Sequence, residues 1–153
     1  MIVRKKLSGK ILKKCLKNEK KFIGCYSMSN LPTFPKVLPA TMIINIDNIH
    51  WVALVLTDKN CFYFDSLAVP IKKRLLNFIN IRYSMYYFNN NKIQCKKSNA
   101  CGLYCCAFIK FVKTKTSYCN FLNFFSYKTV RNDDIVINKL LITLFDYFIH
   151  LTF

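Results

Sequence analysis

Acidic residues are scarce in this sequence. Seven Asp and Glu residues stand against 24 Lys and Arg residues, which gives a formal net charge of +17, and Glu19 is the only glutamate. A surplus of positive charge this large usually indicates a polyanionic partner, most often nucleic acid. An AT-rich coding sequence would also produce much Lys, Asn, Ile, Phe and Tyr with little Ala, Gly and Arg, but it would not remove glutamate. Both explanations of the charge stay open here.

Histidine is scarcer still, with only His50 and His150 in the chain. The sequence also lacks the paired C-x2-C spacing of zinc sites, although it has eight cysteines. Since structural zinc is held by closely spaced pairs of Cys or His ligands, we expect no metal site.

No secretory signal is recognisable: there is no basic and then apolar segment with a small-residue cleavage site at the start of the sequence. This absence argues against a secreted disulfide framework. Cys105 and Cys106 are adjacent within an apolar run of helical length, where we interpret them as small buried hydrophobes. We therefore expect free thiols and a reducing location, either the nucleus of a host cell or the interior of a virion.

A membrane span is not expected either. The longest apolar segment is a predicted helix from about Asp134 to His150, capped by Asn132 or Asp133. Polar residues recur on one of its faces at i, i+4, i+7 and i+11, namely Lys139, Thr143, Asp146 and His150. A spanning helix would rarely carry Lys and Asp in its middle, so we interpret this segment as a packing helix.

What the chain does contain is enough apolar material for one folded domain over residues 1–153, with 53% hydrophobic and 16% aromatic residues. The pattern predicts an α+β fold, with a central mixed or antiparallel sheet of about five strands flanked by helices. A short amphipathic helix is expected after Ser8, and a loop from Phe22 to Pro39. Strands are expected at 41–46, 51–57, 61–65 and in two pieces over 86–94, and further helices at 70–83 and 101–113.

Cys101 is the strongest candidate for a nucleophile. It precedes Gly102 and a run of apolar residues, which places its thiol in the first turn of a buried helix. The positive end of the helix dipole lowers the pKa of a thiol at this position and favours the thiolate. A glycine next to the thiol removes a side chain that would crowd an approaching substrate carbonyl.

Three further residues complete a catalytic set with Cys101. His50 begins one strand and Asp65 ends its antiparallel neighbour, so the two lie at the same end of a hairpin and their side chains can meet. The histidine is then the base for Cys101, and Asp65 fixes its tautomer and orientation. Gln94, seven residues before Cys101, can donate to the oxyanion together with the backbone N–H of Cys101.

The order His, Asp, Gln, Cys, with Cys-Gly at a helix start, resembles the adenovirus protease (adenain) family and the related SUMO-specific and NEDD8-specific proteases. The segment Asn99-Ala100-Cys101-Gly102-Leu103-Tyr104-Cys105-Cys106 and the gap from Gln94 are similar to adenain. The similarity extends through His50-Trp51-Val52-Ala53 and Cys61-Phe62-Tyr63-Phe64-Asp65 to the segment at Phe22, and so covers most of residues 8–112. Asp65 stands where the adenoviral enzymes commonly have glutamate, as in the SUMO proteases.

This resemblance implies a permuted papain-like cysteine protease fold and cleavage after Gly-Gly or Gly-X, with Trp51 and Gly102 at a narrow substrate groove. The catalytic chemistry would need no cofactor. Adenain is stimulated by DNA and by a peptide that forms a disulfide upstream of the glutamine. This chain has no cysteine between Cys61 and Cys95 for such a peptide.

Two clusters of basic residues are candidate phosphate contacts. The alternative is that they are simply solvated faces of surface helices. The clusters are Lys5, Lys6, Lys10, Lys13 and Lys14 near the N-terminus, and Lys72, Lys73 and Arg74 on the predicted 70–83 helix.

The sequence therefore predicts a monomeric viral thiol endopeptidase that matures structural or core precursor proteins. The alternative within enzymes is a protease that removes a ubiquitin-like modifier or SUMO after its Gly-Gly end. The alternative outside enzymes is a DNA-binding core protein on a decayed protease fold. The complete set of four candidate catalytic residues argues against the last of these.

Overall fold

The computed structural model describes residues 5–140, including the side chains of all but Lys139 and Leu140. It contains five strands, β1 (Phe22–Ser27), β2 (Ala40–Ile46), β3 (His50–Leu56), β4 (Cys61–Phe64) and β5 (Tyr87–Phe88). Its α-helices are α1 (Gly9–Cys15), α2 (Lys73–Ile79), α3 (Cys101–Phe111), α4 (Lys115–Asn123) and α5 (Asn132–Ile135). Short 3-10 turns span Met28–Asn30 and Thr129–Arg131, and a π-helical segment spans Val136–Leu140.

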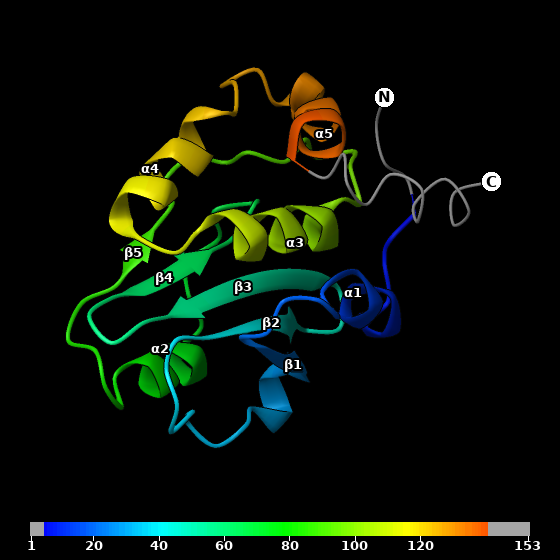
Figure 1. Ribbon diagram of the computed structural model, residues 1–153. Helices are drawn as coiled ribbons and strands as arrows, with labels where there is room; N and C mark the ends of the chain where they lie inside the picture. The colour runs from blue at the N-terminus through cyan, green and yellow to red at the C-terminus, as the bar shows by residue number, and fades with distance from the viewer. Residues whose placement is uncertain (1–4, 141–153) are drawn as a thin grey trace.

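The strands form one mixed sheet in the order β1-β2-β3-β4-β5 (Figure 1). The three central strands are antiparallel to one another, and the two outer pairs, β1 with β2 and β4 with β5, are parallel. The turn between β2 and β3 passes through Asp47 and Asn48, which have φ values of 53° and 59°. Asp and Asn tolerate this left-handed conformation better than most residues do. The predicted α+β fold with a five-stranded mixed sheet is thus confirmed.

Both faces of the sheet are covered, which explains why the central strands are apolar on both sides. On one face Ala53, Val55 and Phe64 pack against α3. On the other face, alternate residues such as Val52 and Leu54 pack against α2. Figure 1 shows α3 across the first face, with α4 and α5 beyond it, and α2 against the second face.

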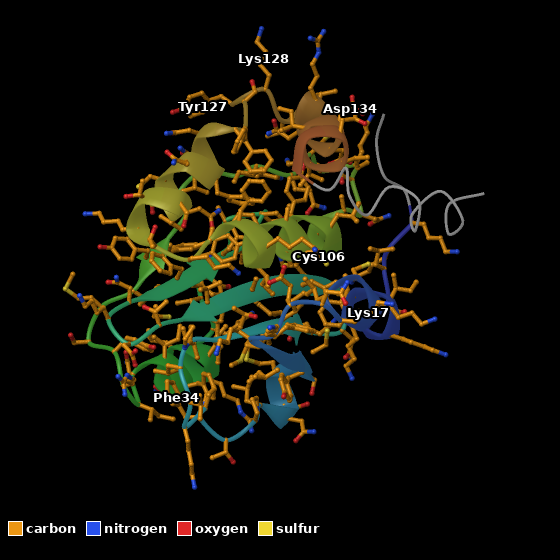
Figure 2. All side chains as sticks on the ribbon, in the orientation of Figure 1. Lys17, Phe34, Cys106, Tyr127, Lys128 and Asp134 are labelled. Atoms are coloured by element: carbon orange, nitrogen blue, oxygen red, sulfur yellow. The ribbon has the colours of Figure 1, made fainter. Side chains whose placement is uncertain are left out.

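Aromatic side chains fill both layers. Phe64 stacks on Phe108 of α3, with ring centroids 4.8 Å apart. In the other layer Phe34, which lies among the side chains beside α2 in Figure 2, approaches Phe78 to 5.3 Å. The sheet is packed between these two layers, which fixes the main chain at the ends of β3 and β4. Side chains that extend from these ends therefore have defined positions.

The start of β3 and the start of α3 lie at the same end of the sheet, beside α1 (Figure 1). Ser8 caps α1 through a bond from the Ile11 N–H to its side chain, as predicted. Leu12 of α1 and Leu16, which caps its C-terminal end, are buried in the same apolar cluster as α3. This end of the molecule therefore brings together residues from three separate stretches of the chain.

Two predicted segments near the sheet edges were wrong. The expected loop from Phe22 contains β1. Gly24, a residue type that often interrupts strands, is accommodated at an irregularity of this strand with a φ of 143°. The expected strand leading into Gln94 is absent, since the N–H groups of Ile93 and Gln94 both donate to one carbonyl, that of Ser66. Only Tyr87–Phe88 of that stretch pairs with the sheet.

The helices also differ at their ends. The helix predicted from Pro70 to Tyr83 spans only Lys73–Ile79. No helix was predicted between residue 113 and the last helix, but α4 forms there behind a capping box of Thr114 and Ser117. The last predicted helix begins at Asn132, preceded by Arg131, and most of it lies outside the described residues, including Thr143, Asp146 and His150.

Within residues 5–140, no helix is long and apolar enough to cross a membrane. All eight cysteines are free thiols in this structure. Cys105 and Cys106 are fully buried in the core, where the sequence placed them.

Candidate active site

His50 and Asp65 form a hydrogen-bonded pair at the end of the β3–β4 hairpin. Nε2 of His50 lies 2.5 Å from Oδ1 of Asp65. Ala53 is paired with Phe64, so Asp65 lies just past the last residue pair and diagonally across from His50. The Asp65 side chain is 1% exposed and that of His50 is 12% exposed. The predicted meeting of these two side chains is therefore present in the structure.

Asp65 is held in place by several backbone groups. Its Oδ1 accepts the Leu67 N–H at 2.8 Å and its Oδ2 accepts the Val69 N–H at 3.3 Å. The side chain of Asn89 makes two hydrogen bonds with the main chain of Asp65. Its Oδ1 accepts the Asp65 N–H at 3.0 Å, and its Nδ2 donates to the Asp65 carbonyl at 2.6 Å. The carboxylate can therefore rotate little, and it fixes the orientation of the His50 ring.

Cys101 is the first residue of α3, and its thiol and the His50 imidazole lie close enough for each group to shift the pKa of the other. Because Nε2 of His50 is bonded to Asp65, the ring nitrogen left for the thiol is Nδ1. Burial raises the pKa of the Cys101 thiol. The hydrogen bonds with His50 and with the backbone of Trp51, together with the charges of His50 and Lys6, outweigh this effect and lower the pKa below 9.0.

The pKa of His50 shifts in the opposite direction. Burial disfavours its charged form, but hydrogen bonds with Asp65 and Cys101 and the negative charge of both groups raise its pKa to about 9. A lowered thiol pKa beside a raised imidazole pKa favours transfer of the proton from sulfur to the ring. The arrangement can hold a thiolate–imidazolium pair, which is the reactive state of a nucleophilic cysteine.

The side chain of Gln94 lies between Ser66, which follows Asp65, and Ser98, which lies in the segment before Cys101. Its Oε1 accepts a hydrogen bond from the Ser66 hydroxyl at 2.6 Å, and its Nε2 donates to the Ser98 carbonyl at 2.7 Å. The side chain is buried, with the residue 3% exposed. Nε2 carries a second N–H that the bond to Ser98 does not use, and this is the candidate donor to an oxyanion.

Trp51 and Gly102 lie beside Cys101. The indole N–H of Trp51 donates to the Leu7 carbonyl at 2.9 Å, so the N-terminal segment passes next to this ring. A Cβ on Gly102 would lie 2.9 Å from Cδ2 of Leu12 and 3.5 Å from Cδ1 of Trp51. The missing side chain thus lets α1 and Trp51 approach the start of α3. Cys101 itself is 3% exposed, so access to its sulfur is narrow.

The two basic clusters lie apart from each other. Figure 1 shows α1, beside the candidate site, well separated from α2. Among the ion pairs of the described residues, Lys72, which directly precedes α2, pairs with Asp47 at 3.7 Å. Glu19 pairs with Lys110 and Lys113 rather than with the lysines of α1. Lys10, Lys13 and Lys14 are exposed. The α1 cluster is therefore the less neutralised of the two.

Two residues of the site were not identified from the sequence. Ser66 and Asn89 are both nearly inaccessible, and they connect Asp65 to Gln94 and to the chain after β5. Asn89 belongs to an Asn-rich run, a composition typical of turns. Ser66 could have been noticed only through its position next to Asp65, because nothing else in the pattern distinguishes its hydroxyl.

Among residues 5–140 no group of three or more His, Cys, Asp or Glu side chains is arranged to hold a metal ion.

No family model matches the sequence, and a search of curated proteins finds no similar sequence. Solved structures do match. The ASFV pS273R protease is similar with a TM-score of 0.55 and 16% identity, covering 86% of this chain. SUMO protease Ulp1, with its catalytic cysteine oxidised to a sulfinic acid, is similar with a TM-score of 0.53 and 14% identity, covering 93% of this chain.

This chain spans 64% of the length of the ASFV protease and 78% of that of Ulp1. Identities of 14% and 16% show a shared fold. The predicted fold class, that of the SUMO protease-like cysteine proteases, is thereby confirmed. The closer similarity to adenovirus protease stays a prediction from the sequence.

Proposed function

We propose that this chain, residues 1–153, is a cysteine endopeptidase of one catalytic domain. The observation that carries the proposal is the Asp65–His50 hydrogen bond together with the electrostatic interaction of His50 with the Cys101 thiol at the start of a buried helix. A purely structural role for a buried cysteine does not explain a neighbouring histidine whose ring is oriented by a fixed carboxylate. The protease fold of the solved structures supports the same function.

In the proposed mechanism, the Cys101 thiolate attacks the carbonyl carbon of the scissile peptide bond. The negative oxygen that develops accepts hydrogen bonds from the Gln94 amide and the Cys101 backbone N–H. The His50 imidazolium gives its proton to the leaving nitrogen, the C–N bond breaks, and an acyl-enzyme thioester remains. A water molecule, deprotonated by His50, then releases the carboxylate product and regenerates the thiol.

The substrate is proposed to carry glycine before the scissile bond. The residues Cys101 and Trp51 are both almost covered, with exposed fractions of 3% and 7%. A peptide with side chains at the positions next to the cleavage site would collide with these walls, whereas Gly-Gly or Gly-X would pass. Narrowness of this kind is the physical basis of the proposed specificity.

Two classes of protein substrate fit this specificity. We propose viral structural or core precursors first, because the chain is small and strongly basic, and the protein would then work in a host nucleus or a virion as a monomer. A protease that cleaves SUMO or another ubiquitin-like protein after Gly-Gly fits the fold equally well, since Ulp1 is similar over 93% of this chain. Asp65 is also the acid found in SUMO proteases.

Cleavage assays on purified substrates test the proposal and separate the two classes. We expect the wild-type chain to cleave Gly-Gly-X peptides, and Cys101→Ser to cleave none above background. Precursors of ubiquitin-like proteins are compared with structural precursors that contain internal Gly-Gly-X sites, and the faster class identifies the substrate. Cleavage by Cys101→Ser at the wild-type rate would show that Cys101 is not the nucleophile.

We also propose that DNA binds the lysines of α1 and acts as an activator. In fluorescence anisotropy with duplex DNA, replacing Lys10, Lys13 and Lys14 together by Gln should weaken binding. The slope of log affinity against log salt should fall by roughly 0.9 for each lysine that contacts a phosphate. The same replacement of Lys72, Lys73 and Arg74 is the matched control. A larger loss in the control would move the site to α2, and no loss in either would contradict DNA binding.

A further inference from the structure

The amide of Gln94 is held at both ends inside the protein. The Ser66 hydroxyl donates to its Oε1 at 2.6 Å, and its Nε2 donates to the Ser98 carbonyl at 2.7 Å. Ser98 is itself tied to the start of α3, since its hydroxyl accepts the Ala100 N–H at 3.0 Å. The carbonyl of Ser98 can only accept, so it determines which end of the amide is the NH2 group. The Ser66 hydroxyl then supplies the partner for the oxygen.

Ser66 also holds the main chain of Gln94. The Ser66 carbonyl accepts the N–H groups of Ile93 and Gln94, each at 2.9 Å. Ser66 is 0% exposed and directly follows Asp65 in the chain. One buried residue thus joins the carboxylate that orients His50 to the amide that is to receive the oxyanion.

Removal of the Ser66 hydroxyl would leave the buried Oε1 of Gln94 without its donor. A buried amide oxygen without a partner is unfavourable, so the side chain would rotate or shift to find one. An oxyanion donor stabilises the transition state only if it is already aimed when charge develops. The O–H donation to Oε1 also polarises the amide and strengthens its N–H groups as donors.

We propose that Ser66 is a positioning residue for catalysis, which keeps the free N–H of Gln94 aimed at the oxyanion. This role rests on the proposed function, in which Gln94 is an oxyanion donor. Ser66 does not touch the substrate, so it should act on the rate of the chemical step through Gln94 and leave substrate binding alone.

A double-mutant cycle measures this dependence. The kcat and KM values for a Gly-Gly-aminomethylcoumarin peptide are determined for wild type, Ser66→Ala, Gln94→Ala and the double variant. Gln94→Ala should lower kcat by about 10²–10³-fold, as expected for one oxyanion donor. Ser66→Ala should lower kcat by about tenfold with KM within twofold, because misaligning a donor costs less than deleting it. In the Gln94→Ala background, Ser66→Ala should have no further effect on kcat.

Two sets of variants separate this role from a merely structural one. Tyr104→Phe removes another buried hydrogen bond between side chains, from the Tyr104 hydroxyl to Asp133 at 2.8 Å, and should keep the wild-type kcat. Ser66→Thr and Ser66→Val have the same shape and differ by the hydroxyl, so both report on Ser66 even if Ser66→Ala folds poorly. Ser66→Thr should keep the higher kcat of the two.

Equal losses of kcat from Ser66→Ala in both backgrounds would overturn the positioning role and leave Ser66 a structural residue. Equal kcat values for Ser66→Thr and Ser66→Val would overturn it as well. A wild-type kcat in Gln94→Ala would overturn the oxyanion assignment within the proposed function, which is a different result from failure at Ser66.

Discussion

Cys101 is expected to react with iodoacetamide well below pH 9, and His50→Ala should remove this reactivity. A thiol with pKa 9.0 is only about 1% thiolate at pH 7. In the wild-type chain the interaction with His50 lowers the pKa of the Cys101 thiol and so favours the thiolate. We therefore expect alkylation of Cys101 at pH 7 to be at least about tenfold faster in wild type than in His50→Ala, after allowing for the lower nucleophilicity of a low-pKa thiolate.

The pH dependence of cleavage follows from the same pair. Catalysis needs the thiolate and the imidazolium together, so activity should fall on the acid side as Cys101 binds a proton. It should fall on the alkaline side near pH 9, where His50 loses its proton. His50→Ala should lower kcat/KM by roughly 10⁴-fold, because both activation of the thiol and protonation of the leaving nitrogen are lost.

Peptide mass spectrometry measures the extent of alkylation over time, so the rate is obtained for each cysteine separately. Cys119 is exposed and far from His50 in sequence, and its rate should be the same in both proteins. A wild-type Cys101 that reacts at pH 7 no faster than a small-molecule thiol would contradict the ion pair. So would equal rates for Cys101 in wild type and His50→Ala.

The second large effect is expected from Asp65→Asn. The substituted side chain must place an NH2 group either at the Oδ1 position, against the Nε2–H of His50 and the N–H of Leu67, or at the Oδ2 position, against the N–H of Val69. All three of these groups are donors. The negative charge that helps to raise the pKa of His50 also disappears. We expect kcat/KM to fall by roughly 10²–10⁴-fold, and the alkaline limb of the pH profile to move below pH 9.

The shift of the alkaline limb distinguishes this effect from simple loss of stability. Asp133→Asn is the matched control, since Asp133 is also buried and accepts a hydrogen bond from a side chain, that of Tyr104. It should leave the alkaline limb where it is in wild type. An Asp65→Asn protein with full activity and an unmoved limb would show that Asp65 has no part in orienting or charging His50.

The elements that carry strong periodicity were predictable from the chain. The strands near 41–46, 51–57 and 61–65 and the helix at Cys101 appear in the structure within a residue or two of their expected bounds, because each is a continuous apolar run between turn residues. The cap at Ser8 was predictable for the same local reason. The helix α4 carried its own signal in Thr114 and Ser117, which was not used.

Segments whose form depends on distant partners were not predictable. β1 is a strand because β2 offers it a parallel edge, in spite of Gly24. The stretch before Gln94 is not a strand, because its N–H groups are taken by the Ser66 carbonyl. In both cases a bond to a residue remote in sequence outweighs the local preference.

The sequence alone determined which residues are available for chemistry: one histidine and one aspartate on a hairpin, a glutamine, and a cysteine at a helix start, each marked by residue type and spacing. Only the tertiary structure decided that the imidazole reaches both the carboxylate and the thiol, and that Ser66 and Asn89 support them. The reason is physical: strand and helix periodicity depends on neighbours in the chain, whereas a hydrogen bond between buried side chains depends on the packing of the whole sheet and its helices.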